Sequence, residues 1–159
     1  AKSKHNEGST FYFTIPYVKT REKKKPVASK PPIGYYNWSD KTILLVEDEP
    51  ANIHFLEEII KTTDARILLA RNGVEAIRSF ENHGAIDVII MDIKMPKMDG
   101  YQATQRIREM DMDIPIISQT AYAFDEEIEK AKEVGMTDYI AKPIKPIKLL
   151  TMINKYIDV

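Results

Sequence analysis

Charged and hydroxyl side chains follow four short apolar runs of this sequence, and these side chains are of the types that bind metal ions and phosphate. Apolar runs at residues 42–46, 86–91, 114–119 and 137–141 each end at or just before such a group. The groups are, in chain order, an acidic cluster (Glu47, Asp48 and Glu49), a carboxylate (Asp92), a hydroxyl (Thr120, followed by Ala121) and an ammonium (Lys142, followed by Pro143).

Together these groups suit Mg²⁺-dependent phosphoryl chemistry. Carboxylates held close together cannot all stay ionised without a compensating cation, so either their pKa values rise or a metal binds. Oxygen ligands suit Mg²⁺, which commonly bridges to phosphate. A divalent ion and Lys142 would neutralise a phosphoryl group, to which Thr120 and the backbone amide of Ala121 could donate hydrogen bonds. Asp92 would then be an in-line nucleophile that forms an acyl phosphate.

Each of these residues taken alone also has a simpler explanation. Acidic residues after a strand often serve as charges at a helix N-terminus, and for Glu49, which precedes Pro50, we favour that explanation. A Thr at a strand end is usually a packing or turn residue, and a Lys before a proline is usually exposed. The joint placement of all the candidates at one edge of a predicted sheet nevertheless favours a functional site.

The elements that must position this site are predicted from hydrophobic periodicity. Five apolar runs, 42–46, 65–70, 86–91, 114–119 and 137–141, indicate strands covered on both faces. Five sets of mostly apolar residues have helical spacing: Ile53, Leu56, Ile59 and Ile60; Val74, Ile77 and Phe80; Tyr101, Thr104, Ile107 and Met110; Phe124, Ile128 and Ala131; and Leu149, Leu150, Ile153, Tyr156 and Ile157. The acidic residues around the fourth set are predicted to face outward. This alternation predicts a doubly wound α/β fold, a (βα)5 three-layer sandwich with a parallel sheet. Sites in such sheets lie beyond the carboxyl ends of the strands.

Composition excludes several classes of protein. The chain has 159 residues with 43% hydrophobic and 30% charged residues, a balance typical of a soluble globular protein. It has no cysteine, which excludes disulfides and thiolate chemistry, and its three histidines lie far apart, which argues against a zinc site. No apolar run is long enough to span a membrane, and there is no signal-peptide pattern.

The net charge of −1 hides a division of the chain into two segments. Residues 1–41 carry nine Lys/Arg against three Asp/Glu, whereas residues 42–159 carry fourteen against twenty-one. Residues 19–40 have the composition of a basic, Pro-rich linker, although Tyr35, Tyr36 and Trp38 are expected to pack on the following domain. Before the linker, the alternating aromatic segment 9–16 predicts one strand. The short Lys23–Lys25 run is more consistent with a solvated tether than with nucleic-acid binding.

Residues 41–159 resemble the receiver domain of two-component response regulators. Four segments carry the resemblance: ILLVEDEP at 43–50, VIIMDIKMPKMDG at 88–100, PIISQTA at 115–121 and YIAKP at 139–143. The resemblance implies a flavodoxin-like fold with the strand order 2-1-3-4-5. It also implies that Asp92 accepts a phosphoryl group from phosphohistidine in a Mg²⁺-dependent reaction.

The same resemblance implies a role for each site residue. Asp48 would bind Mg²⁺ directly and Glu47 through water, with Asp92 and the backbone carbonyl of Lys94 as further ligands. Lys142 and the amide of Ala121 would bind the phosphoryl group.

Two further residues would form a switch. Thr120 would supply the switch hydroxyl, and Tyr139 an aromatic side chain that turns inward and reshapes the face formed by the fourth helix, fifth strand and fifth helix. Lys94 and Tyr122 would tune the lifetime of the acyl phosphate, and the Lys142–Pro143 bond is often cis in this family.

A second, shorter resemblance concerns the N-terminus. Residues 3–16 resemble the last strand of the ATP-binding domain of a sensor histidine kinase, although Asn6 stands where relatives often have Gly. Residues 1–18 would then be the remnant of that domain, residues 19–40 the linker and residues 41–159 the receiver. This order implies a hybrid sensor kinase cut before its receiver, so the chain itself should neither bind ATP nor autophosphorylate.

Three other functions were considered. An aspartate-nucleophile phosphohydrolase would carry a second Asp where this chain has Lys94, and a DNA-binding regulator would need an output domain after the last helix, where the chain ends at Val159. A receiver-like module that never takes phosphate would not need Asp48, Asp92, Thr120 and Lys142 together.

The implied partners are the phosphohistidine domain of a histidine kinase, a histidine phosphotransfer protein, or both, with no nucleic acid and no membrane contact by this chain. The expected location is cytoplasmic, in a parent anchored to the membrane as a sensor.

Overall fold

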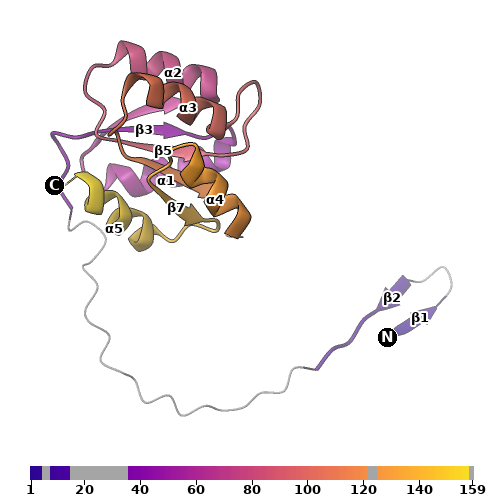
Figure 1. Cartoon of the computed structure of the whole chain (residues 1–159). Coiled ribbons are helices and arrows are strands. Elements are labelled where there is room, and N and C mark those ends of the chain that lie inside the picture. Colours follow the sequence, from indigo (N-terminus) through magenta and orange to yellow (C-terminus); the bar gives the residue numbers. More distant parts are fainter. Residues whose placement is uncertain (5–7, 15–35, 122–124, 158–159) are drawn as a thin grey trace. The chain divides into compact units, whose positions relative to one another are not determined.

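The computed structural model describes residues 1–4, 8–14, 36–121 and 125–157, in two separate units. In the second unit, five strands alternate with five helices, as the sequence predicts (Figure 1). The elements are β3 (Thr42–Val46), α1 (Pro50–Lys61), β4 (Arg66–Ala70), α2 (Gly73–Asn82), β5 (Val88–Asp92), α3 (Gly100–Met110), β6 (Ile116–Thr120), α4 (Asp125–Glu133), β7 (Asp138–Ala141) and α5 (Pro146–Ile157).

The five strands form one parallel sheet in the order β4-β3-β5-β6-β7. This is the order that the resemblance implied, so the doubly wound α/β prediction is confirmed. Helices α1 and α5 pack on one face of the sheet and α2, α3 and α4 on the other, which produces three layers (Figure 1). The central strands β3, β5 and β6 are buried on both faces because their successive side chains meet one helix layer or the other, whereas the edge strand β4 keeps Arg66 and Leu69 exposed.

Strands β5 and β6 begin and end later than their apolar runs suggest. The runs 86–91 and 114–119 start with Ile86 and Ile114, which are buried but precede the strands. Apolar content alone could not separate a buried loop residue from a strand residue. The consequence is functional, since Asp92 and Thr120 are the last residues of their strands and are held by the sheet.

The aromatic residues before β3 belong to the packed unit. Trp38 is 1% exposed, stacks on Tyr36 with ring centroids 5.2 Å apart, and donates its indole N–H to Asn154 Oδ1 on α5. Both aromatic residues contact the core between the sheet, α1 and α5, as predicted; Tyr35 lies outside the described residues. The packed structure therefore begins before residue 41, the predicted boundary of the domain.

The N-terminal unit differs from the single predicted strand over 9–16. It contains a short antiparallel pair, β1 (Lys2–Lys4) with β2 (Gly8–Thr10), in which Lys2 lies opposite Thr10. The exposed residues 11–14 have no regular secondary structure. Residues 15–16 lie outside the described part. The strand predicted over residues 9–16 is thus confirmed at Ser9 and Thr10 and wrong at residues 11–14.

Among the described residues, no helix combines the length and apolarity needed to cross a bilayer.

Candidate functional site

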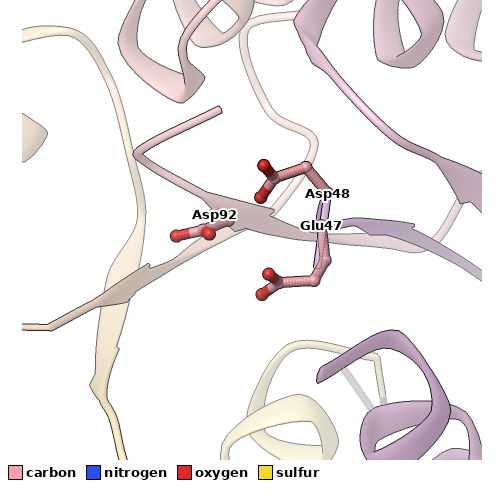
Figure 2. Close-up of side chains that lie close together, drawn as sticks. All are labelled: Glu47, Asp48 and Asp92. Carbon is pink, nitrogen blue, oxygen red and sulfur yellow. The ribbon is translucent and has the colours of Figure 1, made fainter. Parts of the chain in front are cut away.

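Three carboxylates converge at the carboxyl edge of the sheet. Strands β3 and β5 pair in register, with Val46 beside Met91, so the next residues, Glu47 and Asp92, emerge side by side. Oxygen atoms of Glu47, Asp48 and Asp92 lie within 4.8 Å of one another, and Figure 2 shows the three carboxylate groups close together. Glu47 is fully buried and Asp92 is 8% exposed, which makes this cluster unlike a group of surface acids.

The ammonium of Lys142 is the counter-ion of this cluster. Its Nζ donates to Glu47 Oε2 at 2.8 Å and to Asp92 Oδ2 at 3.0 Å. The backbone N–H of Lys142 donates to the carbonyl of Thr120, which fixes the chain just beyond β7, and the Lys142–Pro143 bond is cis. The structure therefore brings together the residues at the ends of β3 and β5 and just after β7 in the way that the sequence predicted.

Burial and charge shift the protonation equilibria of this site. Burial raises the pKa of Asp92, and the nearby charge of Glu47 raises it further, against the opposing effect of Lys142. For Lys142, burial favours the neutral amine, but its bonds to Glu47 and Asp92 outweigh burial and raise its pKa. These surroundings disfavour the ionised form of Asp92, and a divalent cation at the cluster would stabilise it.

A small cavity adjoins the Asp92 carboxylate. Its volume is about 100 Å³ and its lining residues are Asp92, Ile93, Lys94, Gln119, Thr120, Ala121, Glu127 and Lys142. Lys94 is exposed and borders this cavity, as expected for a residue of the site. Tyr122, which was expected to act nearby, lies outside the described residues.

Glu127 is a site residue that the sequence reasoning missed. The hydroxyl of Thr120 donates to Glu127 Oε2 at 2.8 Å, so this α4 carboxylate faces the site. The prediction that the acidic residues of this helix face outward is wrong for Glu127, which is half-buried and borders the cavity. No spacing signal distinguishes it from its neighbours, because Asp125, Glu126, Glu127 and Glu129 form one acidic stretch.

Tyr139 is not among the residues that line the cavity beside Asp92. It is half-buried on β7, and it pairs in register with Ser118, two positions before Thr120. Alternation along a strand places Ser118 and Thr120 on the same face of the sheet, and Tyr139 shares that face. This position is compatible with the expected contact between an aromatic switch and the site hydroxyl.

The loop after Asp92 is held by the start of α3. Asp99 and Gln102 form a reciprocal capping box, and the N–H of Gly100 donates to the carbonyl of Ile93 at 2.9 Å. A methyl group at Gly100 would overlap the carbonyl oxygen of Asp92, so only glycine fits this close approach.

We therefore expect Gly100→Ala to lower the free energy of unfolding by about 1–3 kcal/mol, because the backbone at Asp92 must move to accept the methyl group. Urea unfolding measures this loss. Gly84→Ala is the matched control, since a Cβ at Gly84 meets no atom within 4 Å, and its unfolding should change by about 0.5 kcal/mol or less. Equal effects of the two substitutions would contradict the steric argument.

Comparison with known proteins agrees with this site. A family model described as the response regulator receiver domain matches residues 43–154. Among curated proteins, the sensor histidine kinase RcsC of Salmonella typhimurium is 36% identical over 105 residues, which are 66% of this chain and 11% of that protein. The sensor histidine kinase GacS of Pseudomonas protegens is 32% identical over 119 residues, 72% of this chain and 13% of that protein. The chain thus spans about a tenth of the length of these relatives.

Solved structures give the same result. The receiver domain of the sensor histidine kinase PA1611 from Pseudomonas aeruginosa is 37% identical, with a TM-score of 0.70 over 75% of this chain and 98% of that one. That structure is described as holding a magnesium ion coordinated in the active-site cleft. The chemotaxis protein CheY4 of Vibrio cholerae is 25% identical, with a TM-score of 0.69 over 73% of this chain and 98% of that one. The match across residues 43–154, together with the carboxylates, hydroxyl and ammonium at the sheet edge, shows that the chain belongs to the response regulator receiver domain family.

Proposed function

We propose that this chain is a phosphoryl-accepting receiver of a two-component phosphorelay. The observation that carries the proposal is the position of the Asp92 carboxylate, which lies in a three-carboxylate cluster and 3.0 Å from the Lys142 ammonium. A nucleophilic carboxylate, a cation-binding cluster and a fixed ammonium are the parts that phosphoryl transfer needs.

In the proposed reaction, an Asp92 oxygen attacks the phosphorus of a phosphohistidine. An O–P bond forms and the P–N bond breaks, and its electron pair goes to the ring of a phosphohistidine that is protonated at its other nitrogen, so neutral imidazole leaves and no further reactant is consumed. The Lys142 ammonium neutralises the phosphoryl oxygens. Thr120 and Ala121 line the cavity beside Asp92. The Thr120 hydroxyl and the backbone amide of Ala121 donate hydrogen bonds to the phosphoryl oxygens there.

The residues present fit a Mg²⁺ ion, because they are hard oxygen donors close together and partly buried. Asp48, Asp92 and the backbone carbonyl of Lys94 would hold it, with Glu47 acting through water. When bound, the ion supplies positive charge that offsets the carboxylates and the incoming phosphoryl oxygens.

The switch that follows begins at Thr120. Its hydroxyl is bonded to Glu127 in the present structure, and we propose that it turns to the phosphoryl group on Asp92. Tyr139 would then turn inward and alter the surface formed by α4, β7 and α5, the region that downstream proteins read.

We also propose the context in which the domain works. The similarity to sensor histidine kinases supports a hybrid kinase as the parent, with a phosphohistidine domain or a histidine phosphotransfer protein as partner. Residues 1–18 would be the remnant of the kinase ATP-binding domain and residues 19–40 the linker. Absence of ATP binding by this chain, measured by calorimetry, is the expected result; micromolar binding would contradict the remnant assignment.

The function is tested by incubating the chain with acetyl phosphate and Mg²⁺ and measuring its intact mass. We expect the addition of one phosphoryl group that hydroxylamine removes and that chelation of Mg²⁺ with EDTA prevents. Rapid turnover of p-nitrophenyl phosphate would instead indicate a phosphohydrolase. A chain that stays unmodified by acetyl phosphate and by a phosphorylated kinase would be a binding module that does not take phosphate.

A further inference from the structure

Gln119 on β6 is buried without satisfying its side-chain amide. It has no exposed surface, and among the described residues neither Oε1 nor Nε2 has a hydrogen-bond partner. An unpaired buried amide carries a free-energy penalty that an apolar residue of similar size would avoid. On the same strand, Ile116 and Ile117 are apolar, and the buried hydroxyl of Ser118 donates to the carbonyl of Asp138, so Gln119 differs from each of them. A buried amide without a partner needs an explanation, and one explanation is a hydrogen-bond partner that is present only in another state of the protein.

The position of Gln119 points to the phosphoacceptor site. Gln119 pairs in register with Asp92 on the neighbouring parallel strand, so both side chains lie on the same face of the sheet. Gln119 lines the cavity beside Asp92 and also a larger cavity of about 460 Å³ between α1 and the segment after β7. Lys142 lines both cavities as well. The unpaired amide is thus a neighbour of both the nucleophile and the ammonium.

The chemistry of the amide complements what enters the site. A carboxamide offers N–H donors and one carbonyl acceptor, a phosphoryl group offers acceptors, and a lysine ammonium offers donors. In the present structure the Lys142 ammonium is bonded to Glu47 and Asp92. A phosphoryl group on Asp92 would provide the acceptor that Nε2 lacks and would attract the ammonium toward itself, within reach of Oε1.

Building on the proposed phosphoryl-accepting function, we propose that Gln119 is a phosphoryl-binding residue. In the phosphorylated state its Nε2 donates to a phosphoryl oxygen on Asp92, and its Oε1 accepts a hydrogen bond from Lys142. The penalty that Gln119 imposes on the unmodified protein is then relieved when the site is loaded, which favours the phosphorylated state.

Beryllofluoride with Mg²⁺, a non-covalent mimic of an acyl phosphate, tests this proposal on the intact chain. The affinity of Gln119→Met for beryllofluoride should be about tenfold weaker than that of the unsubstituted chain, because one charge-assisted hydrogen bond is lost. The melting temperature of the same variant without ligand should be higher, because the unpaired amide is gone. A purely structural Gln119 would change the melting temperature and leave the affinity for beryllofluoride unaltered.

Thr104→Val is the matched control, because Thr104 Oγ1 on α3 is also buried without a partner among the described residues. It should raise the melting temperature and leave beryllofluoride affinity unchanged. Gln119→Leu repeats the test with a second apolar side chain. In the unsubstituted chain, the side-chain amide resonances of Gln119 should shift on beryllofluoride binding, a measurement that depends on no variant.

The possible outcomes separate this proposal from the function on which it rests. Tighter or equal binding by Gln119→Met, with normal binding by the unsubstituted chain, would overturn the role of Gln119 and leave the receiver function standing. Failure of the unsubstituted chain to bind beryllofluoride would overturn both. Weaker binding by both Gln119 variants, with unchanged binding by Thr104→Val, would support the proposal.

Discussion

Replacing Asp92 by asparagine should abolish Mg²⁺-dependent phosphorylation of this chain. The amide cannot act as the nucleophile, and within the described residues the other carboxylates of the cluster, Glu47 and Asp48, belong to a different strand end. Acetyl phosphate labelling followed by intact-mass measurement should show the unmodified mass after times at which the unsubstituted chain is fully labelled. Labelling of Asp92→Asn at an unchanged rate would remove Asp92 from the role of phosphoacceptor.

The loss of phosphorylation in Asp92→Asn should not come from unfolding of the variant. Burial and the charge of Glu47 raise the pKa of Asp92, so the folded protein binds this proton more tightly than the unfolded chain does. The ionised carboxylate therefore costs stability near neutral pH, and its replacement by a neutral amide should leave the melting temperature equal or higher. Asp87→Asn is the matched control near the start of β5, where Asp87 Oδ2 accepts the N–H of Thr42, and it should be labelled normally.

Replacing Lys142 by methionine should lower the rate of phosphorylation by about 10²–10³-fold, because a preorganised charge facing the phosphoryl oxygens is lost. It should also lower the free energy of unfolding by about 1–3 kcal/mol near neutral pH, since Glu47 and Asp92 lose their shared donor. Added Mg²⁺ should raise the melting temperature of Lys142→Met more than that of the unsubstituted chain, because the ion replaces the missing positive charge.

The stability loss in Lys142→Met should depend on pH in a defined direction. Lys142 opposes the raised pKa of Asp92, so its removal raises that pKa further. The loss is largest where Asp92 is ionised and shrinks as pH falls and Asp92 becomes protonated. Lys148→Met, on an exposed position of α5, should behave like the unsubstituted chain in labelling and unfolding at each pH. A stability loss in Lys142→Met that is independent of pH would contradict the electrostatic account.

The fold was largely predictable because the central strands β3 and β5 are almost wholly apolar and each helix has one apolar stripe. The strand bounds were less predictable, since Ile86 and Ile114 are buried outside the sheet and look like strand residues in the sequence. The prediction of a strand over residues 9–16 is wrong at residues 11–14, because strand formation depends on a partner segment. Aromatic alternation over residues 11–14 indicates strand propensity but does not show which residues lie opposite.

The candidate site was predictable where sheet topology determines it. Parallel strands bring Glu47, Asp92 and Lys142 to one edge of the sheet. Two carboxylates and an ammonium at that edge then indicate cation and phosphoryl binding. Glu127 and Gln119 could not be found in this way. Glu127 reaches Thr120 from a helix whose rotation is set by packing. Gln119 looks like a polar interruption of a buried strand until its side-chain amide is found to have no hydrogen-bond partner in the described part of the chain.

Mapping the phosphoryl group by peptide mass spectrometry tests the central claim most directly. After acetyl phosphate treatment with Mg²⁺, reduction of the acyl phosphate with borohydride marks the modified residue before digestion. The mark should lie on Asp92 and on no other residue, and it should be absent when Mg²⁺ is chelated. A mark on a histidine, on Asp48 or on Glu47, with Asp92 unmodified, would contradict it.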